Sequence, residues 1–171
     1  LEAEPWVQRA WVRRRWPGHV EVAVSRVRPV GRLPDGTEVM PDGTLGGAAP
    51  EHSVLPVLHV DRERVPELLA VYEALAPPLL ELGRAVDSVR AVPGGVWVVE
   101  TDDGTELAFS DADFAGQVGR VLRGYRRLVR GDRAIERIDG RYPDGIAVRF
   151  EAPSAREGTA RARELARLES D

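Results

Sequence analysis

The chain has 171 residues, 43% of them hydrophobic, and a net charge of -4. It contains no cysteine, lysine or asparagine, which excludes Schiff-base lysines, lysine-dependent phosphate loops, cysteine nucleophiles, disulfides, iron–sulfur clusters and cysteine-rich zinc sites. The length suffices for a hydrophobic core, and because no run of about 18 apolar residues is present we expect the chain as given to be soluble.

The N-terminal part is expected to form a β-hairpin. Val20, Val22 and Val24 alternate with small or polar residues, which is the period of a half-buried strand. The turn before it is the Trp-Pro-Gly-His segment at 16–19, and residues 6–14 are its predicted partner.

Three tryptophans, Trp6, Trp11 and Trp16, recur at a spacing of five residues that matches neither a helix face nor a strand face. We expect them to anchor the core, and an aromatic contact patch is the minority interpretation.

Residues 33–60 are expected to be rich in loops. A Pro-Asp-Gly-Thr motif occupies 34–37 and recurs at 41–44. Proline presets φ and glycine accepts a positive φ, so this motif favours turns. Two carboxylates without EF-hand spacing do not suit calcium.

A first helix is predicted after Asp61, which is a suitable N-cap, and Pro77-Pro78 is expected to end or kink it. Its apolar stripe comprises Val65, Leu68, Leu69, Tyr72, Leu75 and Ala76. Strands at 96–100 and 106–109 follow, joined by a loop with Gly104 at a natural turn position.

Neither of two candidate catalytic or metal-binding pairs is favoured. Asp102 and Asp103 lie in that hairpin loop, where carboxylates are usually exposed and have ordinary pKa values. His59 and Asp61 lack a third ligand for a metal.

A second helix over 111–130 is predicted, with Ser110 and Asp113 forming a capping box. Its apolar face comprises Phe114, Val118, Val121, Leu122, Tyr125, Leu128 and Val129. The remainder of the helix carries Arg120, Arg123, Arg126, Arg127 and Arg130.

This arginine face allows two interpretations. A nucleic-acid-binding module is the alternative function, since phosphates attract clustered arginines. We favour a solvated face that pairs with residues 61–115, because that segment has a net charge of -8 whereas residues 116–150 have +5.

The last predicted strands are 135–139 and 145–150, with Tyr142 between them. A final strand is a good candidate for a sheet edge, whose unpaired backbone groups can accept a partner segment. A tyrosine that packs on its own sheet from a turn is an equally good interpretation. Residues 152–171 are mostly Ala, Arg and Glu and are expected to form a helical or disordered tail.

Four stretches, taken in order, resemble the FtsQ/DivIB family of bacterial cell-division proteins. They are Pro-Trp-Val at 5–7 with Trp-Pro at 16–17, the strand and Arg-Pro-Val over 20–30, Leu-Pro-Val-Leu at 55–58, and Ile-Asp-Gly-Arg-Tyr-Pro-Asp-Gly within 138–149. Among the departures, Gly140 stands where the family has a strand leucine. The resemblance spans residues 5–150.

The resemblance implies an α+β fold, in which the strand hairpin of a partial POTRA module precedes a mostly antiparallel β-sheet domain with two packed helices. The implied boundaries are 1–32 for the C-terminal half of the POTRA-like module, 33–151 for the β domain and 152–171 for the polar tail. The family's membrane-spanning helix and the first half of its POTRA module are not in this sequence.

The resemblance also implies a non-enzymatic divisome scaffold without cofactors, catalytic residues, metals or nucleic-acid partners. Such a protein lies on the extracytoplasmic side of the cytoplasmic membrane at the septum and recruits FtsB and FtsL. By motif match, the FtsB-binding positions are Tyr142, Asp144, Gly145, Ile146, Ala147, Val148, Arg149 and Phe150. A second strand, with Val20, Val22, Val24 and Arg26, corresponds to a weaker contact with FtsK.

Overall fold

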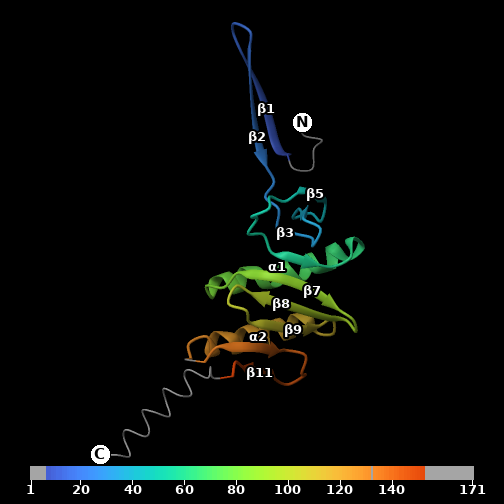
Figure 1. The fold of residues 1–171 in the computed structure, drawn as a ribbon, viewed down its shortest axis with the longest axis vertical. Coiled ribbons are helices and arrows are strands. Elements are labelled where there is room, and N and C mark those ends of the chain that lie inside the picture. The colour runs from blue at the N-terminus through green and yellow to red at the C-terminus, as the bar shows by residue number, and fades with distance from the viewer. Residues whose placement is uncertain (1–6, 132, 153–171) are drawn as a thin grey trace, which may run out of the picture.

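The computed structural model describes residues 7–131 and 133–152, in an α+β arrangement of two sheets and two long helices. Strands β1 (Val7–Arg15) and β2 (His19–Arg26) form an antiparallel hairpin that projects away from the rest of the molecule (Figure 1). The remaining strands build one nine-stranded mixed sheet in the order β11-β10-β9-β8-β7-β6-β3-β4-β5. The predicted N-terminal hairpin is therefore confirmed.

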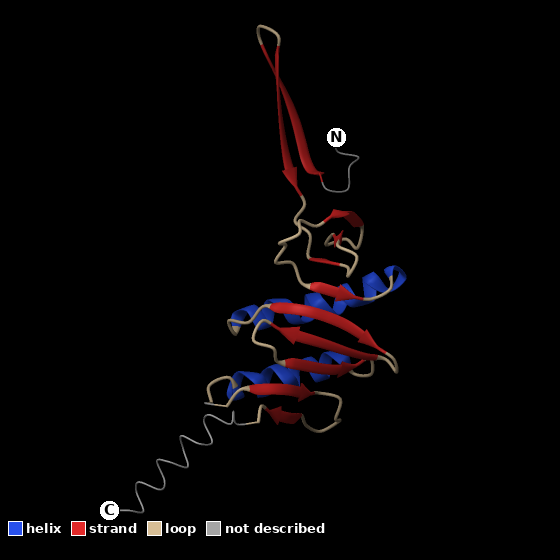
Figure 2. Cartoon of the chain, in the orientation of Figure 1, coloured by secondary structure: helices blue, strands red, loops and turns tan. Residues whose placement is uncertain are grey.

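Five of the eight pairings in the large sheet are antiparallel, as expected. Its strands are β3 (Gly31–Arg32), β4 (Thr37–Val39), β5 (Leu45–Ala48), β6 (Val57–His59), β7 (Val86–Val92), β8 (Val96–Thr101), β9 (Glu106–Ser110), β10 (Ile135–Asp139) and β11 (Ala147–Phe150). Helices α1 (Val65–Glu81) and α2 (Phe114–Leu128) pack against this sheet, and Figure 2 shows them behind its strands.

The core lies between the two helices and the central strands. Leu68, Leu75 and Leu79 of α1 are fully buried, as are Tyr125 of α2 and Phe109 of β9. The apolar periodicity that predicts both helices is thus the pattern by which they cover the sheet.

The Pro-Asp-Gly motifs form turns, as predicted. Asp35 Oδ1 accepts a hydrogen bond from the backbone N–H of Thr37 at 2.9 Å, and Asp42 repeats this with Thr44 at 3.0 Å. Gly36 and its counterpart in the second motif have φ near +84° and +83°, which explains the glycine. The loop-rich prediction for 33–60 missed the short strands β4, β5 and β6.

The ends of α1 differ in part from the prediction. Asp61 is an N-cap residue, but of a 3-10 turn (Arg62–Arg64) that precedes α1, and its side chain makes no cap bond; α1 itself begins at Val65. The helix continues through Pro77 and Pro78 to Glu81. Leu79 is fully buried beyond the prolines, so packing holds the last turn despite the lost backbone hydrogen bonds.

The predicted capping box at the start of α2 was also wrong. Asp113 is the N-cap residue, but it has φ 52° and makes no side-chain cap bond. Buried Gln117 instead accepts from the Ser110 N–H at 2.9 Å and donates to Ser110 Oγ at 2.8 Å and to the carbonyl of Ala112. The helix is thereby fastened to the end of β9 by its own first turn.

Candidate partner-binding edge

Strand β11 is one edge of the nine-stranded sheet, in line with the expectation for the last strand. It pairs only with β10 among the described strands, with Ile138 opposite Val148. The N–H of Glu151 donates to the carbonyl of Ala134 across this pair at 3.0 Å. Since successive backbone groups of a strand point to opposite sides, the N–H groups of Phe150 and Val148 face the open edge.

The two faces of β11 differ in chemistry. Ile146, Val148 and Phe150 are half-buried and pack against the core. Ala147 and Arg149 are exposed. The strand therefore has an apolar side that continues the core and a polar side that faces water.

The Ile146 side chain packs against α2 at Gly124, where the helix has no side chain. A Cβ at Gly124 would lie 2.2 Å from Ile146 Cδ1, so this approach requires glycine. At the other end of the strand, the Arg133 guanidinium carbon lies 4.1 Å from the Phe150 ring centroid, a cation–π distance. Helix α2 and its following loop thus position both ends of the edge.

The loop before β11 holds Tyr142 with 55% of its surface exposed. The Arg120 guanidinium donates to the Tyr142 carbonyl at 3.2 Å. Arg141 forms an ion pair with Asp139 at 2.6 Å, and hydrogen bonds from Arg141 lower the pKa of Asp139 from its usual 3.8. Asp144 is exposed. The loop is therefore held by its backbone and by arginines while the tyrosine ring remains accessible.

Sequence reasoning did not identify Arg120, Gly124 or the Asp139–Arg141 pair as parts of this region. Glycine inside a helix is costly, but α2 also contains Gly116 and Gly119, so the sequence does not single out Gly124 as the site of a close approach. The bond from Arg120 to Tyr142 joins residues 22 apart and depends on tertiary placement. The Asp139–Arg141 pair is local, two residues apart, but the sequence does not show that it would form beside the sheet edge.

The second predicted partner strand, β2, lies far from β11 along the molecule (Figure 1). Val20, Val22 and Val24 occupy one face of the hairpin and are 60%, 49% and 37% exposed. Arg26 ends the strand. The structure does not bring the two predicted contact strands together.

The tryptophans of the hairpin correct the expectation of core anchors. Trp11 is 59% exposed and Trp16 is 95% exposed, because no second layer covers the projecting hairpin in the described part of the chain. Trp6 and residues 153–171 of the tail predicted at 152–171 lie outside the described residues.

On the arginine face of α2, Arg123, Arg126, Arg127 and Arg130 are exposed. Within the described residues, Arg120 alone of the five arginines on this face forms an ion pair with the acidic segment, to Asp113 at 3.4 Å. The expected pairing of the arginine face with residues 61–115 is therefore largely absent from the described structure. Tyr125 is fully buried and Phe114 packs edge-on against Phe109. The helix therefore offers no exposed aromatic ring for base stacking.

Asp103 departs from the expectation of an exposed turn carboxylate with an ordinary pKa. Partial burial tends to raise the pKa of Asp103, but hydrogen bonds from Thr101 and Thr105 and the charge of Arg84 outweigh it and lower that pKa. Arg84 Nε lies 2.9 Å from its carboxylate, and Tyr125 Oη donates to it at 3.3 Å. These contacts tie the β8–β9 loop to α2, which is a structural role.

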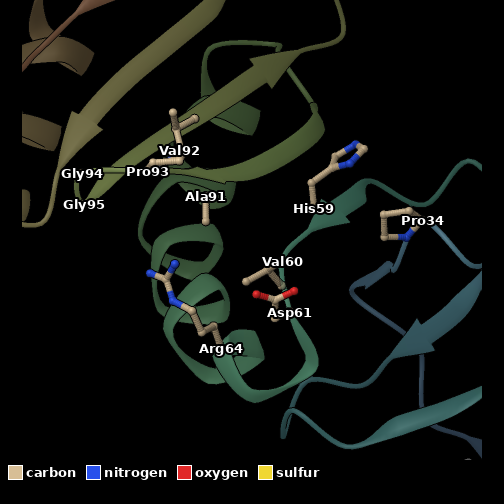
Figure 3. A pocket seen from close by; sticks show the side chains of 10 residues that line it. All are labelled: Pro34, His59, Val60, Asp61, Arg64, Ala91, Val92, Pro93, Gly94 and Gly95. Carbon is tan, nitrogen blue, oxygen red and sulfur yellow. The ribbon is translucent and has the colours of Figure 1, made fainter.

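His59 and Asp61 line a pocket of about 500 Å³ with Arg64 and the β7–β8 turn. Figure 3 shows the His59 ring directed away from the Asp61 carboxylate. Within residues 7–131 and 133–152, no three acidic or histidine side chains are grouped to hold a metal ion. In the same residues, no helix has both the length and the hydropathy needed to cross a membrane.

A family model described as "Cell division protein FtsQ/DivIB, C-terminal" matches residues 34–141, from the first Pro-Asp-Gly turn through β10. The chain belongs to the FtsQ/DivIB family. The match ends before β11, whereas similarity to whole FtsQ proteins extends over 92% of the chain.

Three proteins named "Cell division protein FtsQ" illustrate the likeness. The one from Allochromatium vinosum is 32% identical over 161 residues, which are 92% of this chain and 63% of that protein. Those from Thioalkalivibrio sp. and Shewanella oneidensis are 31% and 30% identical, again over 92% of this chain and over 67% and 61% of theirs. The chain thus spans about two thirds of the length of these FtsQ proteins.

The comparison confirms the family inferred from the four motifs. It also agrees with the expectation of a cell-division protein from a non-enzymatic family. It does not test the partner-binding positions at β11 and β2, which stay predictions.

Proposed function

We propose that this region of an FtsQ-type protein is a non-enzymatic division scaffold that binds an FtsB-type partner by strand addition at β11. It acts on the extracytoplasmic side of the cytoplasmic membrane at the septum, tethered by a membrane helix outside this sequence. The FtsB-type partner brings FtsL with it, and β2 is a secondary contact for an FtsK-type partner. Family membership and one observation, the open edge at β11, support this proposal.

The edge suits strand addition for a backbone reason. Val148 and Phe150 turn their N–H groups outward, as their neighbour Glu151 is bonded inward to Ala134. An added strand would satisfy these groups whatever its side chains, so main-chain bonds supply affinity and side chains supply specificity.

Side-chain specificity has two candidate anchors at the ends of the edge. Tyr142 is largely exposed, and Phe150 is half-buried beneath Arg133. Aromatic residues beside partly formed pockets are typical of binding hot spots. Arg149 is exposed and forms an ion pair with Glu136 at 2.8 Å, so an acidic partner segment would share this guanidinium with Glu136; such a contact raises the association rate more than the affinity.

The decisive experiment removes one outward N–H group. Proline is tolerated in an edge strand when its nitrogen faces solvent, so Val148→Pro should keep β11 paired with β10 while blocking an added strand. The matched control is Val148→Ala, which also shortens the side chain but keeps the N–H group. Binding is measured by calorimetry with the soluble segment of the same bacterium's FtsB-type protein.

We expect Val148→Pro to weaken binding about tenfold or more, equivalent to about 1.4 kcal/mol, and to weaken it well beyond Val148→Ala. Circular dichroism and urea unfolding report whether the sheet is retained. Equal affinity of the two variants, with both folded, would show that the partner does not use the backbone of this edge.

A further inference from the structure

The tip of the β1–β2 hairpin combines a bare tryptophan with a cluster of arginines. Trp16 is 95% exposed at the turn. It follows Arg13, Arg14 and Arg15, which are all exposed. A large aromatic ring left in water is unfavourable, so its position at an exposed turn calls for an explanation other than packing.

The positive charge at the tip is mostly uncompensated. Arg15 Nε lies 3.3 Å from Glu21 Oε2, with both side chains about 60% exposed. Within the described residues, the side chains of Arg13 and Arg14 form no ion pair or hydrogen bond. Residues 10–25 contain three arginines and one acidic residue, although the whole chain has a net charge of -4. The positive charge is therefore local to the tip.

The strand register spreads this charge around the tip. Arg13 lies opposite Glu21 and Arg15 opposite His19, on the face that carries Trp11, while Arg14 lies opposite Val20 on the other face. Arginines therefore surround Trp16 on both faces of the hairpin. A flat anionic surface can contact several of them while the ring inserts between its headgroups.

We propose that this tip, Arg13 to Trp16, docks on the surface of an anionic lipid bilayer. Tryptophan prefers the boundary between headgroups and acyl chains, where its ring is apolar and its N–H remains hydrated. Arginines beside it are attracted by anionic headgroups, and their stems lie along the apolar boundary. A nucleic acid or an acidic protein would satisfy the charges but gives no reason for a single ring at the apex.

The fold supports docking at this place. Figures 1 and 2 show the tip at one end of the molecule and β11 at the opposite end. The hairpin reaches the sheet through Val27, Arg28 and Pro29, which form neither helix nor strand. A bilayer at the tip would therefore leave the partner edge uncovered, and the inference is independent of the function proposed for β11.

The test is flotation of the full chain with vesicles of phosphatidylcholine, with and without phosphatidylglycerol. We expect binding only when phosphatidylglycerol is present, decreasing with added salt. The double variant Arg13→Gln/Arg14→Gln should reduce the partition coefficient roughly 25-fold, from about fivefold for each basic residue at an anionic surface. The matched control is Arg126→Gln/Arg127→Gln, which removes the same charge from α2 and should change binding little.

Insertion of the ring is measured separately with brominated lipids, which quench nearby tryptophan. The quenching should disappear in Trp16→Phe, which isolates this ring from the other three tryptophans. Three results would overturn the proposal: no preference for phosphatidylglycerol, an equal loss in the α2 control, or binding without quenching that heparin removes completely. The last result would identify a general polyanion site.

Discussion

Replacement of Gly140 by alanine tests the packing of β10 against α2. Gly140 directly follows β10, and its N–H donates to the Ala108 carbonyl of β9 at 2.9 Å. A Cβ built there would lie 2.5 Å from Val121 Cγ2 and 3.4 Å from the Ala108 carbonyl oxygen. Val121 is fully buried, and φ at Gly140 is outside the left-handed region. The alanine is therefore disfavoured by crowding and not by backbone conformation.

The expected cost follows from two opposing effects. Inserting a carbon atom into a filled core typically costs about 1–3 kcal/mol. Alanine also restricts the unfolded chain, which returns about 0.4–1 kcal/mol. Gly140→Ala should thus lower the free energy of unfolding by about 1–2 kcal/mol, and for a chain of this size Tm falls by about 2–4 °C for each kcal/mol.

Urea unfolding followed by circular dichroism measures this change. Gly145→Ala is the matched control, since a Cβ there meets no atom within 4 Å and φ is again outside the left-handed region. The control should be neutral or slightly stabilised. Val121→Ala removes the methyl group that the new Cβ would meet. The loss of unfolding free energy in the double variant should therefore be about 1 kcal/mol smaller than the sum of the losses in the two single variants. Equal midpoints for the two glycine variants, or additive costs in the double variant, would refute the packing argument.

Two further predictions concern the partner edge and the acid limit of stability. Tyr142→Ala should weaken binding of the FtsB-type segment by about 2 kcal/mol or more, as a hot spot does, without changing the urea midpoint; an unchanged dissociation constant removes Tyr142 from the site. Asp103 has a pKa below its usual 3.8, so its stabilising contribution is complete above that value and is lost as the pH falls through the lower folded-state pKa. Asp103→Asn should therefore lose less stability than the native chain as the pH falls through and below 3.8, and identical pH profiles would contradict the role of its contacts.

Local periodicity explains which elements the sequence predicts. Strand β2 follows from alternation and α2 from a 3.6-residue repeat, because one face of each carries the apolar residues. Strands β8 and β9 are short apolar runs, buried on both faces and joined by a turn signal. Strand β7 lies near the middle of the sheet, yet it was not predicted. Its Arg90 bonds to Glu106, and Ser88 Oγ donates to Glu100 at 3.3 Å. These partners lie on the adjacent strand β8 and on β9 beyond it, so the polar residues of β7 gain their partners only after the sheet has formed.

The position of the candidate edge could be predicted from the sequence, but the contacts that hold it could not. A last strand before a polar tail is a reasonable edge, and β11 is one. The contact of Ile146 with Gly124 and the hydrogen bond from Arg120 to the Tyr142 carbonyl depend on where α2 crosses the sheet. A single sequence does not encode that crossing in any local pattern.

The two edges of the large sheet are not equivalent, and their difference favours β11 for strand addition. The opposite edge, β5, is Leu-Gly-Gly-Ala, and a Cβ at Gly46 would lie 2.5 Å from Met40 Cε. Glycines pack no side chain against an added strand and weaken its pairing. Strand β11 offers valine and phenylalanine in the same number of residues.

Arg149 adds a second argument, about which strand can be added. Exposed edges also invite copies of the same chain to pair, and charged edge residues oppose this. Glu136 partly compensates Arg149 through an ion pair at 2.8 Å. Antiparallel pairing of two β11 strands centred on Arg149 would still bring two of these side chains toward each other, and like charges on facing strands are destabilising. An acidic segment would be attracted by this arginine, whereas a second copy of the chain would be repelled by it. The same arginine that attracts the proposed partner therefore disfavours self-association at the edge.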